Sequence, residues 1–201
     1  PAANRNRGAA HATGEWLVFI DDDCLPDRGL LQAYDRAVGS DGKIQVLEGR
    51  TIVDREKRHP FEMAPINDSG GNLWSCNFAI RRDLFLAMGG FDERFKTPAM
   101  EDMDLSRRLK RSGHAARFVP GACVVHSWRM TDIKKHTRQQ AAAVFTFAAI
   151  HHVGGPRKEL IRTHLWNIAR YYWKEFPNEV RQFGLLALRC QPMKLWSFCY
   201  Y

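Results

Sequence analysis

Apolar runs and amphipathic stretches alternate along the first two thirds of the chain, an order that predicts an α/β protein. The continuous apolar run from Trp16 to Ile20 is typical of a strand buried on both faces. Residues 30–38 carry apolar side chains at helical spacing, and Gly39 closes that helix. Another helix is expected over residues 4–12, ended by Gly14. This order favours a mostly parallel sheet with covering helices.

The same pattern continues to about residue 126. β-Branched residues predict one or two strands over 43–53, and residues 73–86 predict a strand followed by a short helix. A further helix opens at Thr97 and ends before Gly113. Residues 117–126 are expected to form two short strands around a Pro-Gly turn. No internal repeat interrupts this series.

The composition changes after Trp128, where Lys, Arg, His and aromatic residues become frequent. Helical periodicity is present over residues 139–150 and 160–176. We therefore expect two parts, an α/β domain over residues 1–130 and a basic, aromatic, helical tail over residues 131–201.

Composition narrows the class of protein. The 201 residues include 30 Lys and Arg against 22 Asp and Glu, and 45% are hydrophobic, which fits a globular chain with a core. A net charge of +8 suits nucleic acid, an anionic membrane surface or a phosphorylated substrate. Nucleic acid is the least expected partner, because the cations are dispersed along the chain. No apolar stretch reaches the roughly 18 to 20 residues of a membrane-spanning helix.

The cysteines are odd in number, widely spaced and form no C-x-x-C pair. They are Cys24, Cys76, Cys123, Cys190 and Cys199. We expect reduced thiols in a cytosolic compartment.

Asp21, Asp22 and Asp23 follow directly after the first predicted strand. Adjacent carboxylates repel each other unless a cation neutralises them, and oxygen ligands suit Mg²⁺ or Mn²⁺. Continued strand alternation would place Asp21 and Asp23 on one side and Asp22 on the other. The alternative is a solvated turn in which one aspartate caps the next helix.

Glu101 and Asp102 begin a predicted helix, where acidic residues are expected from the helix dipole alone. A Gly-Gly loop just upstream makes this helix start a candidate position for a general base. His126 ends a predicted strand, which by itself is an ordinary position for a histidine. His151 and His152 are expected to be surface residues.

Four segments together resemble family 2 glycosyltransferases of the GT-A fold. They are NRNRGAAHATGEWLVFIDDDCLP at 4–26, CNFAIRRDLFLAMGGFDERF at 76–95, EDMDLSRRLKRSG at 101–113 and FVPGACVVH at 118–126. Their order and spacing make the resemblance specific. It implies metal-dependent transfer of a sugar from a nucleotide-sugar donor to the hydroxyl of a saccharide or lipid-linked acceptor, with inversion at the anomeric carbon.

The resemblance also implies roles for individual residues. Asp102 would be the base, with Glu101 beside it. The donor diphosphate would be bound by Arg7, Asp21, Asp22 and Asp23. The acceptor side would include Asn77, Gly89, Gly90 and Asp92. Mg²⁺ or Mn²⁺ would be bound by Asp21, Asp23 and His126.

The family pattern begins with a strand–helix–strand unit that holds the nucleoside, and no such unit precedes residue 4 here. The N-terminal nucleotide-binding half is therefore expected to be missing, so that residues 1–130 form a partial catalytic domain. Either the chain is a fragment of a complete enzyme, or it binds the donor weakly and is inactive alone. The alternative is a catalytically incomplete module that binds a membrane surface or a protein partner. A phosphoryl-transfer enzyme of the haloacid dehalogenase type fits less well, since Cys24 and Leu25 follow D-x-D where that pattern has Thr or Val.

Aromatic and basic residues interleave on a predicted tail helix, which favours contact with an anionic membrane surface. The aromatic residues are Trp166, Tyr171, Tyr172, Trp173 and Phe176, and the basic ones are Arg162, Arg170 and Lys174. Packing of the tail on the α/β domain is the competing expectation. The expected location is the cytoplasm, peripherally at the inner face of the membrane.

Overall fold

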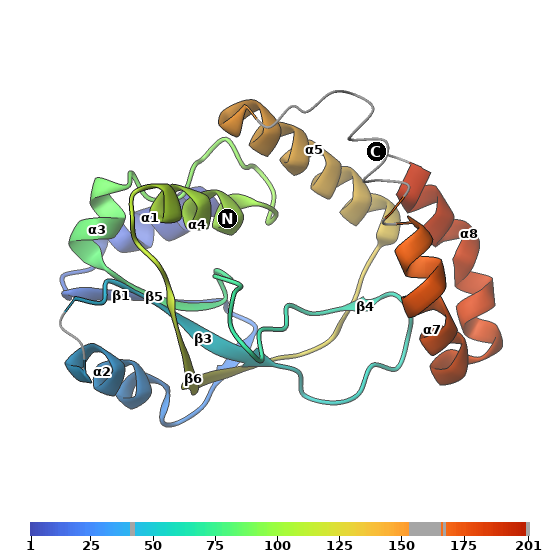
Figure 1. Cartoon of the computed structure of the whole chain (residues 1–201), viewed down its shortest axis with the longest axis horizontal. Coiled ribbons are helices and arrows are strands. Elements are labelled where there is room, and N and C mark those ends of the chain that lie inside the picture. The colour runs from blue at the N-terminus through green and yellow to red at the C-terminus, as the bar shows by residue number, and fades with distance from the viewer. Residues whose placement is uncertain (41–42, 153–165, 167, 200–201) are drawn as a thin grey trace. The chain divides into compact units, whose positions relative to one another are not determined.

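The computed structural model describes residues 1–40, 43–152, 166 and 168–199. Contacts divide the chain into two compact units (Figure 1). The first contains Pro1–Arg55 and Ala64–Trp128, and the second contains Glu56–Met63 and Arg129–Tyr201. The short segment Glu56–Met63 thus belongs with the C-terminal part of the chain.

The first unit is an α/β layer structure. Its elements in chain order are α1 (Ala2–His11), β1 (Trp16–Ile20), β2 (Cys24–Pro26), α2 (Leu30–Ser40), β3 (Val46–Ile52), β5 (Asn77–Arg81), α3 (Arg82–Ala87), α4 (Glu101–Arg111) and β6 (Arg117–His126). The strands form one sheet in the order β1-β5-β3-β6-β2. Figure 1 shows α1, α3 and α4 over one face of this sheet and α2 over the other.

Strand directions in this sheet are mixed. Strands β3 and β6 run parallel, whereas β5 is antiparallel to both β1 and β3, and β2 is antiparallel to β6. The α/β class is confirmed, and the expected parallel pairing is found between β3 and β6. Hydrophobic patterns carry little information on strand direction, because a strand buried on both faces has the same pattern in either direction.

The expected pair of short strands at 117–126 is a single strand, β6, with an irregularity. Gly49 pairs with Val119, but the next residue, Arg50, pairs with Cys123. The Pro-Gly sequence therefore marks a bulge in β6 instead of a turn.

Two apolar cores cover the two faces of the sheet. On the α1, α3 and α4 side, Phe19 stacks on Phe78 with ring centroids 4.8 Å apart, and Phe91 meets Phe19 edge-on at 5.4 Å. On the α2 side, Leu30 and Tyr34 pack against the sheet. Burial on both faces explains why β1 is apolar along its length.

The second unit is mostly helical. Its described elements are β4 (Glu62–Met63), β7 (Arg129–Met130), α5 (Ile133–His151), a π-helical turn η1 (Tyr171–Glu175), α7 (Phe176–Phe183) and α8 (Leu185–Cys199). The side chain of Asp132 caps α5 by accepting a hydrogen bond from the Lys135 backbone N–H at 3.1 Å. Within the described residues, no helix is both long and apolar enough to cross a membrane.

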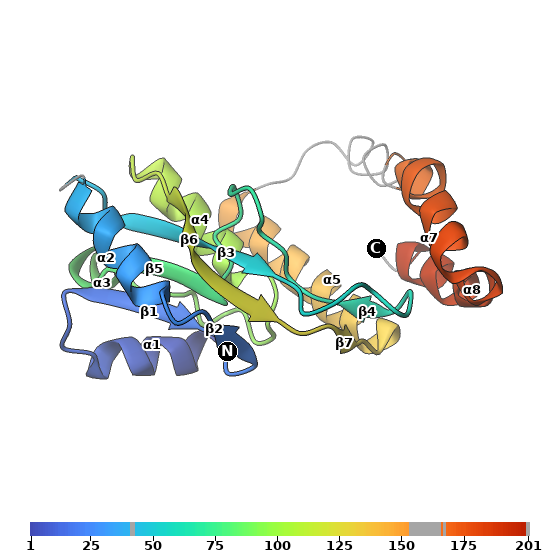
Figure 2. The same cartoon turned by 90° about the horizontal axis from the view of Figure 1, so that it is seen from below.

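Side-chain contacts join η1 to α7 and α8. Figure 2 shows α7 and α8 next to each other. The Tyr171 hydroxyl donates to Glu179 at 2.7 Å, and Lys194 forms an ion pair with the same carboxylate. Tyr172 forms a 3.0 Å hydrogen bond with Gln191. Tyr171 and Tyr172, two of the aromatic residues predicted for a membrane surface, are thus used in internal contacts, whereas Trp166 and Trp173 of that set are exposed.

His151, expected at the surface, is buried and packs on Phe147 with ring centroids 4.4 Å apart. Arg162 lies outside the described residues.

Candidate active site

An arginine on α1 connects the two acidic motifs of the first unit. Its guanidinium donates from Nη2 to Asp21 Oδ1 at 2.6 Å and from Nη1 to Glu101 Oε1 at 3.0 Å. Asp21 directly follows β1, and Glu101 is the first residue of α4. The arginine is Arg5, whereas the resemblance assigned the donor site to Arg7, which is exposed.

Helical spacing contains the signal that would have selected Arg5. The buried residues of α1 are Ala2 and Ala9, and positions 5 and 6 lie between them on the same helical face. Arg5 and Asn6 therefore point inward, and both contact residues more than 80 positions away.

Asp102 lies beside Glu101 in the first turn of α4. Its Oδ1 accepts from the Met103 backbone N–H at 2.8 Å, and its Oδ2 lies 3.4 Å from the Ser75 backbone N–H. Burial, and then the negative charge of Glu101, raise the pKa of Asp102 to about 6. A carboxylate with that pKa is ionised at neutral pH and is a better proton acceptor than an exposed aspartate.

Asp23 lies close to a histidine from another strand. Cys24 pairs with His126 across β2 and β6, which brings Asp23 Oδ2 to 3.2 Å from His126 Nε2. One donor atom each from Asp23, Cys24 and His126 lies within 4.8 Å of the others. The other ring nitrogen of His126 lies 2.9 Å from the Ser127 carbonyl oxygen, an acceptor, so Nδ1 carries the proton and Nε2 can serve as a ligand.

This donor set fits a divalent cation. Carboxylate oxygen and imidazole nitrogen suit Mn²⁺, and the carboxylate suits Mg²⁺. The thiol of Cys24 is a soft ligand, whereas Mg²⁺ and Mn²⁺ prefer hard oxygen donors. Asp23 and His126 are therefore the primary candidates for metal ligands in this unit.

The three aspartates do not continue the strand alternation. The Cys24 backbone N–H bonds to the Asp21 carbonyl at 3.1 Å, which makes residues 21–24 a turn. Asp21 is directed to Arg5 and Asp23 to His126, so the two outer aspartates have different partners. Asp22 is exposed, as the solvated-turn alternative expected.

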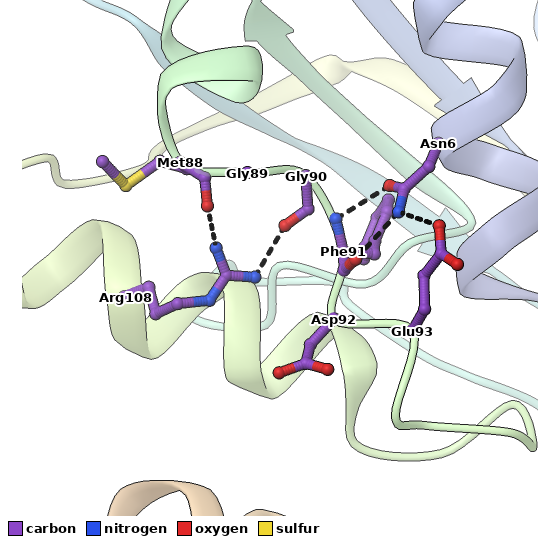
Figure 3. A pocket seen from close by; sticks show the side chains of 8 residues that line it. All are labelled: Asn6, Met88, Gly89, Gly90, Phe91, Asp92, Glu93 and Arg108. Carbon is purple, nitrogen blue, oxygen red and sulfur yellow. Dashed lines mark hydrogen bonds between the residues drawn. The ribbon is translucent and has the colours of Figure 1, made fainter.

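The Gly-Gly loop between α3 and α4 is held from two sides (Figure 3). Arg108 donates to the carbonyls of Met88 and Gly90, both at 2.7 Å, while Asp104 binds the same guanidinium. The side chain of Asn6 pairs with both backbone groups of Phe91 at 2.9 Å. These groups line a pocket of about 390 Å³.

Glycine is required where this loop approaches α1. Gly89 and Gly90 have φ angles of +74° and +67°, and a Cβ on Gly90 would lie 2.6 Å from Asn6 Oδ1. Asp92 lines the same pocket and is bound by Arg94, whose hydrogen bond lowers the pKa of Asp92. Three of the four residues expected on the acceptor side thus gather at one pocket.

The fourth, Asn77, is in the core, which corrects the expectation that it contacts an acceptor. Its side chain is 1% exposed. It accepts from the Tyr34 hydroxyl at 2.7 Å and donates to the carbonyls of Arg50 and Ala122 at 2.8 and 2.9 Å. Asn77 therefore satisfies backbone groups at the β6 bulge, a structural role that sequence alone did not separate from substrate binding.

A candidate cation site at one motif and a separate candidate proton acceptor at another suit transfer of a sugar from a diphosphate to a hydroxyl, the chemistry of glycosyltransferases. Residues 72–174 match the family model described as "Glycosyltransferase like family 2", and residues 1–89 match "Glycosyl transferase family 2". The chain belongs to the family 2 glycosyltransferases.

Two curated relatives from Mycobacterium tuberculosis are similar to this chain. "Pre-mycofactocin glycosyltransferase" is 31% identical over 144 residues, which cover 64% of this chain and 30% of that protein. "N-acetylglucosaminyl-diphospho-decaprenol L-rhamnosyltransferase" is 36% identical over 113 residues, which cover 55% of this chain and 35% of that protein. The chain thus spans about a third of the length of the relatives it matches.

Among solved structures, the mannosyltransferase PcManGT from Pyrobaculum calidifontis, in complex with GDP-Man and Mn²⁺, aligns with 98% of this chain and 66% of its own. The TM-score is 0.47 and the sequence identity is 16%.

Proposed function

We propose that this chain contributes the acceptor-activating and metal-binding part of an inverting glycosyltransferase. The observation that carries the proposal is Asp102, a half-buried carboxylate at the start of α4 with a pKa of about 6. Residues 1–130 are proposed as the catalytic part and residues 131–201 as the accessory tail.

In the proposed reaction the acceptor hydroxyl attacks the anomeric carbon of the donor. A bond forms between the acceptor oxygen and that carbon, while the bond between the carbon and the phosphate oxygen breaks. Asp102 takes the hydroxyl proton, and the nucleoside diphosphate leaves with the bonding electron pair. Because attack and departure are on opposite faces, a single displacement inverts the anomeric configuration.

Asp23 and His126 are proposed to bind the divalent metal. When bound, the metal would offset negative charge on the leaving diphosphate. Arg5 forms ion pairs with Asp21, two residues before Asp23, and with Glu101, which directly precedes Asp102. These ion pairs connect the proposed metal site with the proposed base.

A nucleotide-sugar donor and a saccharide or lipid-linked acceptor are proposed. Support for a lipid-linked acceptor comes from the name of one relative, which specifies a diphospho-decaprenol-linked sugar. The donor is proposed from the family to which the chain belongs. The polar pocket at Gly90 and Asp92 would contribute to the acceptor side.

The reaction is tested by supplying nucleotide sugars with lipid-linked and free saccharide acceptors in Mn²⁺. We expect release of nucleoside diphosphate that requires both the metal and an acceptor, and a product whose anomeric configuration, measured by NMR, is opposite to that of the donor. Retention of configuration would contradict the single displacement. If the protein is folded but releases no nucleoside diphosphate from any donor in the presence of metal, the result would favour the alternative of a module that binds a membrane surface or a protein partner.

Peripheral membrane contact is proposed through one face of α8. Leu185, Leu188 and Leu195 recur at helical spacing and are 73%, 48% and 44% exposed. Arg181 and Arg189 are exposed nearby, and the sequence has no Asp or Glu after residue 179. An apolar stripe flanked only by cations suits anionic lipid headgroups.

Vesicle sedimentation checks this surface. Replacing all three leucines by serine is expected to weaken binding to phosphatidylglycerol vesicles at least about tenfold, since each leucine can contribute roughly 1.5 kcal/mol or more on burial. The matched control is Leu31→Ser, at a leucine of α2 that is 64% exposed. Equal sedimentation of the triple variant and the control would refute the lipid assignment.

A further inference from the structure

We propose that Arg5 is a positioning residue that fixes the metal-side motif and the base-side motif at one spacing. The proposal rests on the proposed function, because the two motifs acquire those roles only in a transferase. The contacts of Arg5 with Asp21 and Glu101 do not depend on the reaction, and they can be tested by thermal melting without any substrate.

Arg5 contacts three segments that are far apart in sequence. Besides Asp21 and Glu101, its guanidinium carbon lies 5.7 Å from the ring centroid of Phe91 in the Gly-Gly loop. Its side chain is 17% exposed, and those of Asp21 and Glu101 are 30% and 4% exposed. A mostly buried carboxylate such as Glu101 needs a paired cation to remain charged at low cost.

The pairing uses the shape of the guanidinium. Nη1 serves Glu101 and Nη2 serves Asp21, so one rigid planar group sets the distance between the two carboxylates. A lysine ammonium is a single point charge on a flexible stem and cannot define that spacing in the same way. Glu101 directly precedes Asp102, hence the same contact holds the first turn of α4 against the end of β1.

The structural link is tested first, without any substrate, by thermal melting of the full chain. Arg5→Met leaves Glu101 buried without its cation and is expected to lower Tm by roughly 5–10 °C. Adding Glu101→Gln should recover most of that loss, because no buried charge then remains. Arg36→Met, at an exposed arginine of α2, should change Tm little. Additive losses in the double variant would overturn the pairing.

The positioning role is tested next by turnover of the double variant Arg5→Met/Glu101→Gln, compared with Glu101→Gln alone. If Arg5 also orients Asp21, the double variant should melt near the parent Tm yet show a kcat about 10- to 100-fold below that of Glu101→Gln. Arg5→Lys should retain charge and most of the Tm but lose kcat to a similar extent. Equal kcat values for the double variant and Glu101→Gln would reduce Arg5 to a structural counterion and refute the proposal.

The two proposals fail in distinguishable ways. If the parent protein transfers no sugar, the proposed function fails while the melting cycle still reports whether Arg5 and Glu101 are coupled. If the parent is active and Arg5→Lys keeps the full kcat, the proposed function stands and the positioning role is wrong.

Discussion

Asp102→Asn is expected to lower turnover by about 10²- to 10⁴-fold, because the amide keeps the size of the side chain but cannot accept the proton of the acceptor hydroxyl. Metal and donor affinity should change little, since the metal is assigned to Asp23 and His126. Steady-state turnover and calorimetric donor titration measure the two effects separately. Glu101→Gln is the matched comparison: it alters the neighbouring carboxylate and leaves Asp102 in place.

The same variant has a distinctive effect on stability. The folded-state pKa of Asp102, about 6, lies above the ordinary aspartate value of 3.8. Folding therefore favours the protonated form, and the stability that this form contributes is lost as pH rises through about 6. Asparagine removes that penalty, so the variant should melt at the same or a higher temperature than the parent at pH 7.5.

The pH profile of the parent follows from the same carboxylate. Turnover should fall as pH drops below about 6, because protonated Asp102 cannot act as a base.

If Asp102→Asn kept the parent rate and Glu101→Gln lost it, the two residues would exchange roles. Full rates in both variants would mean that neither is the base.

Asp23→Ala is expected to weaken Mn²⁺ binding more than about 100-fold, since it removes a carboxylate next to His126 Nε2. Calorimetry with Mn²⁺ and a nucleoside diphosphate measures the loss. His126→Ala should also weaken binding, because it removes the imidazole ligand.

Asp22→Ala provides the control, because Asp22 is adjacent in sequence and exposed. Its metal affinity should stay within about threefold of the parent. A loss in Asp22→Ala as large as that in Asp23→Ala would mean that general negative charge at the turn attracts the metal and that no specific ligand is present.

The sequence was informative where function depends on local chemistry. It placed the three aspartates directly after a buried strand, and it placed Glu101 and Asp102 at the start of a helix, because apolar periodicity and acidic helix starts are local signals. The α/β class also followed from the order of the elements.

The sequence was less informative where roles depend on long-range contacts. Asn77 resembled a site residue, but the backbone carbonyls that it binds come from Arg50 and Ala122, whose proximity only the sheet creates. Arg5 was passed over for Arg7 although helical spacing places Arg5 on the inward face of α1 with Ala2 and Ala9. What the sequence does not contain is the identity of the carboxylates that Arg5 meets, because Asp21 and Glu101 come from distant segments. Strand directions were missed for the same reason, since they depend on which strands become neighbours.

The contact between Arg5 and Glu101 also constrains how the site is assembled during folding. The two residues are separated by 96 positions, and closing so long a loop is entropically unfavourable until the intervening sheet has formed. In a chain synthesised from its N-terminus, α1 must wait for both the Gly-Gly loop and α4 before its inward polar face has partners. Local elements such as α2 can form early, whereas the candidate site exists only once the first unit is completely folded.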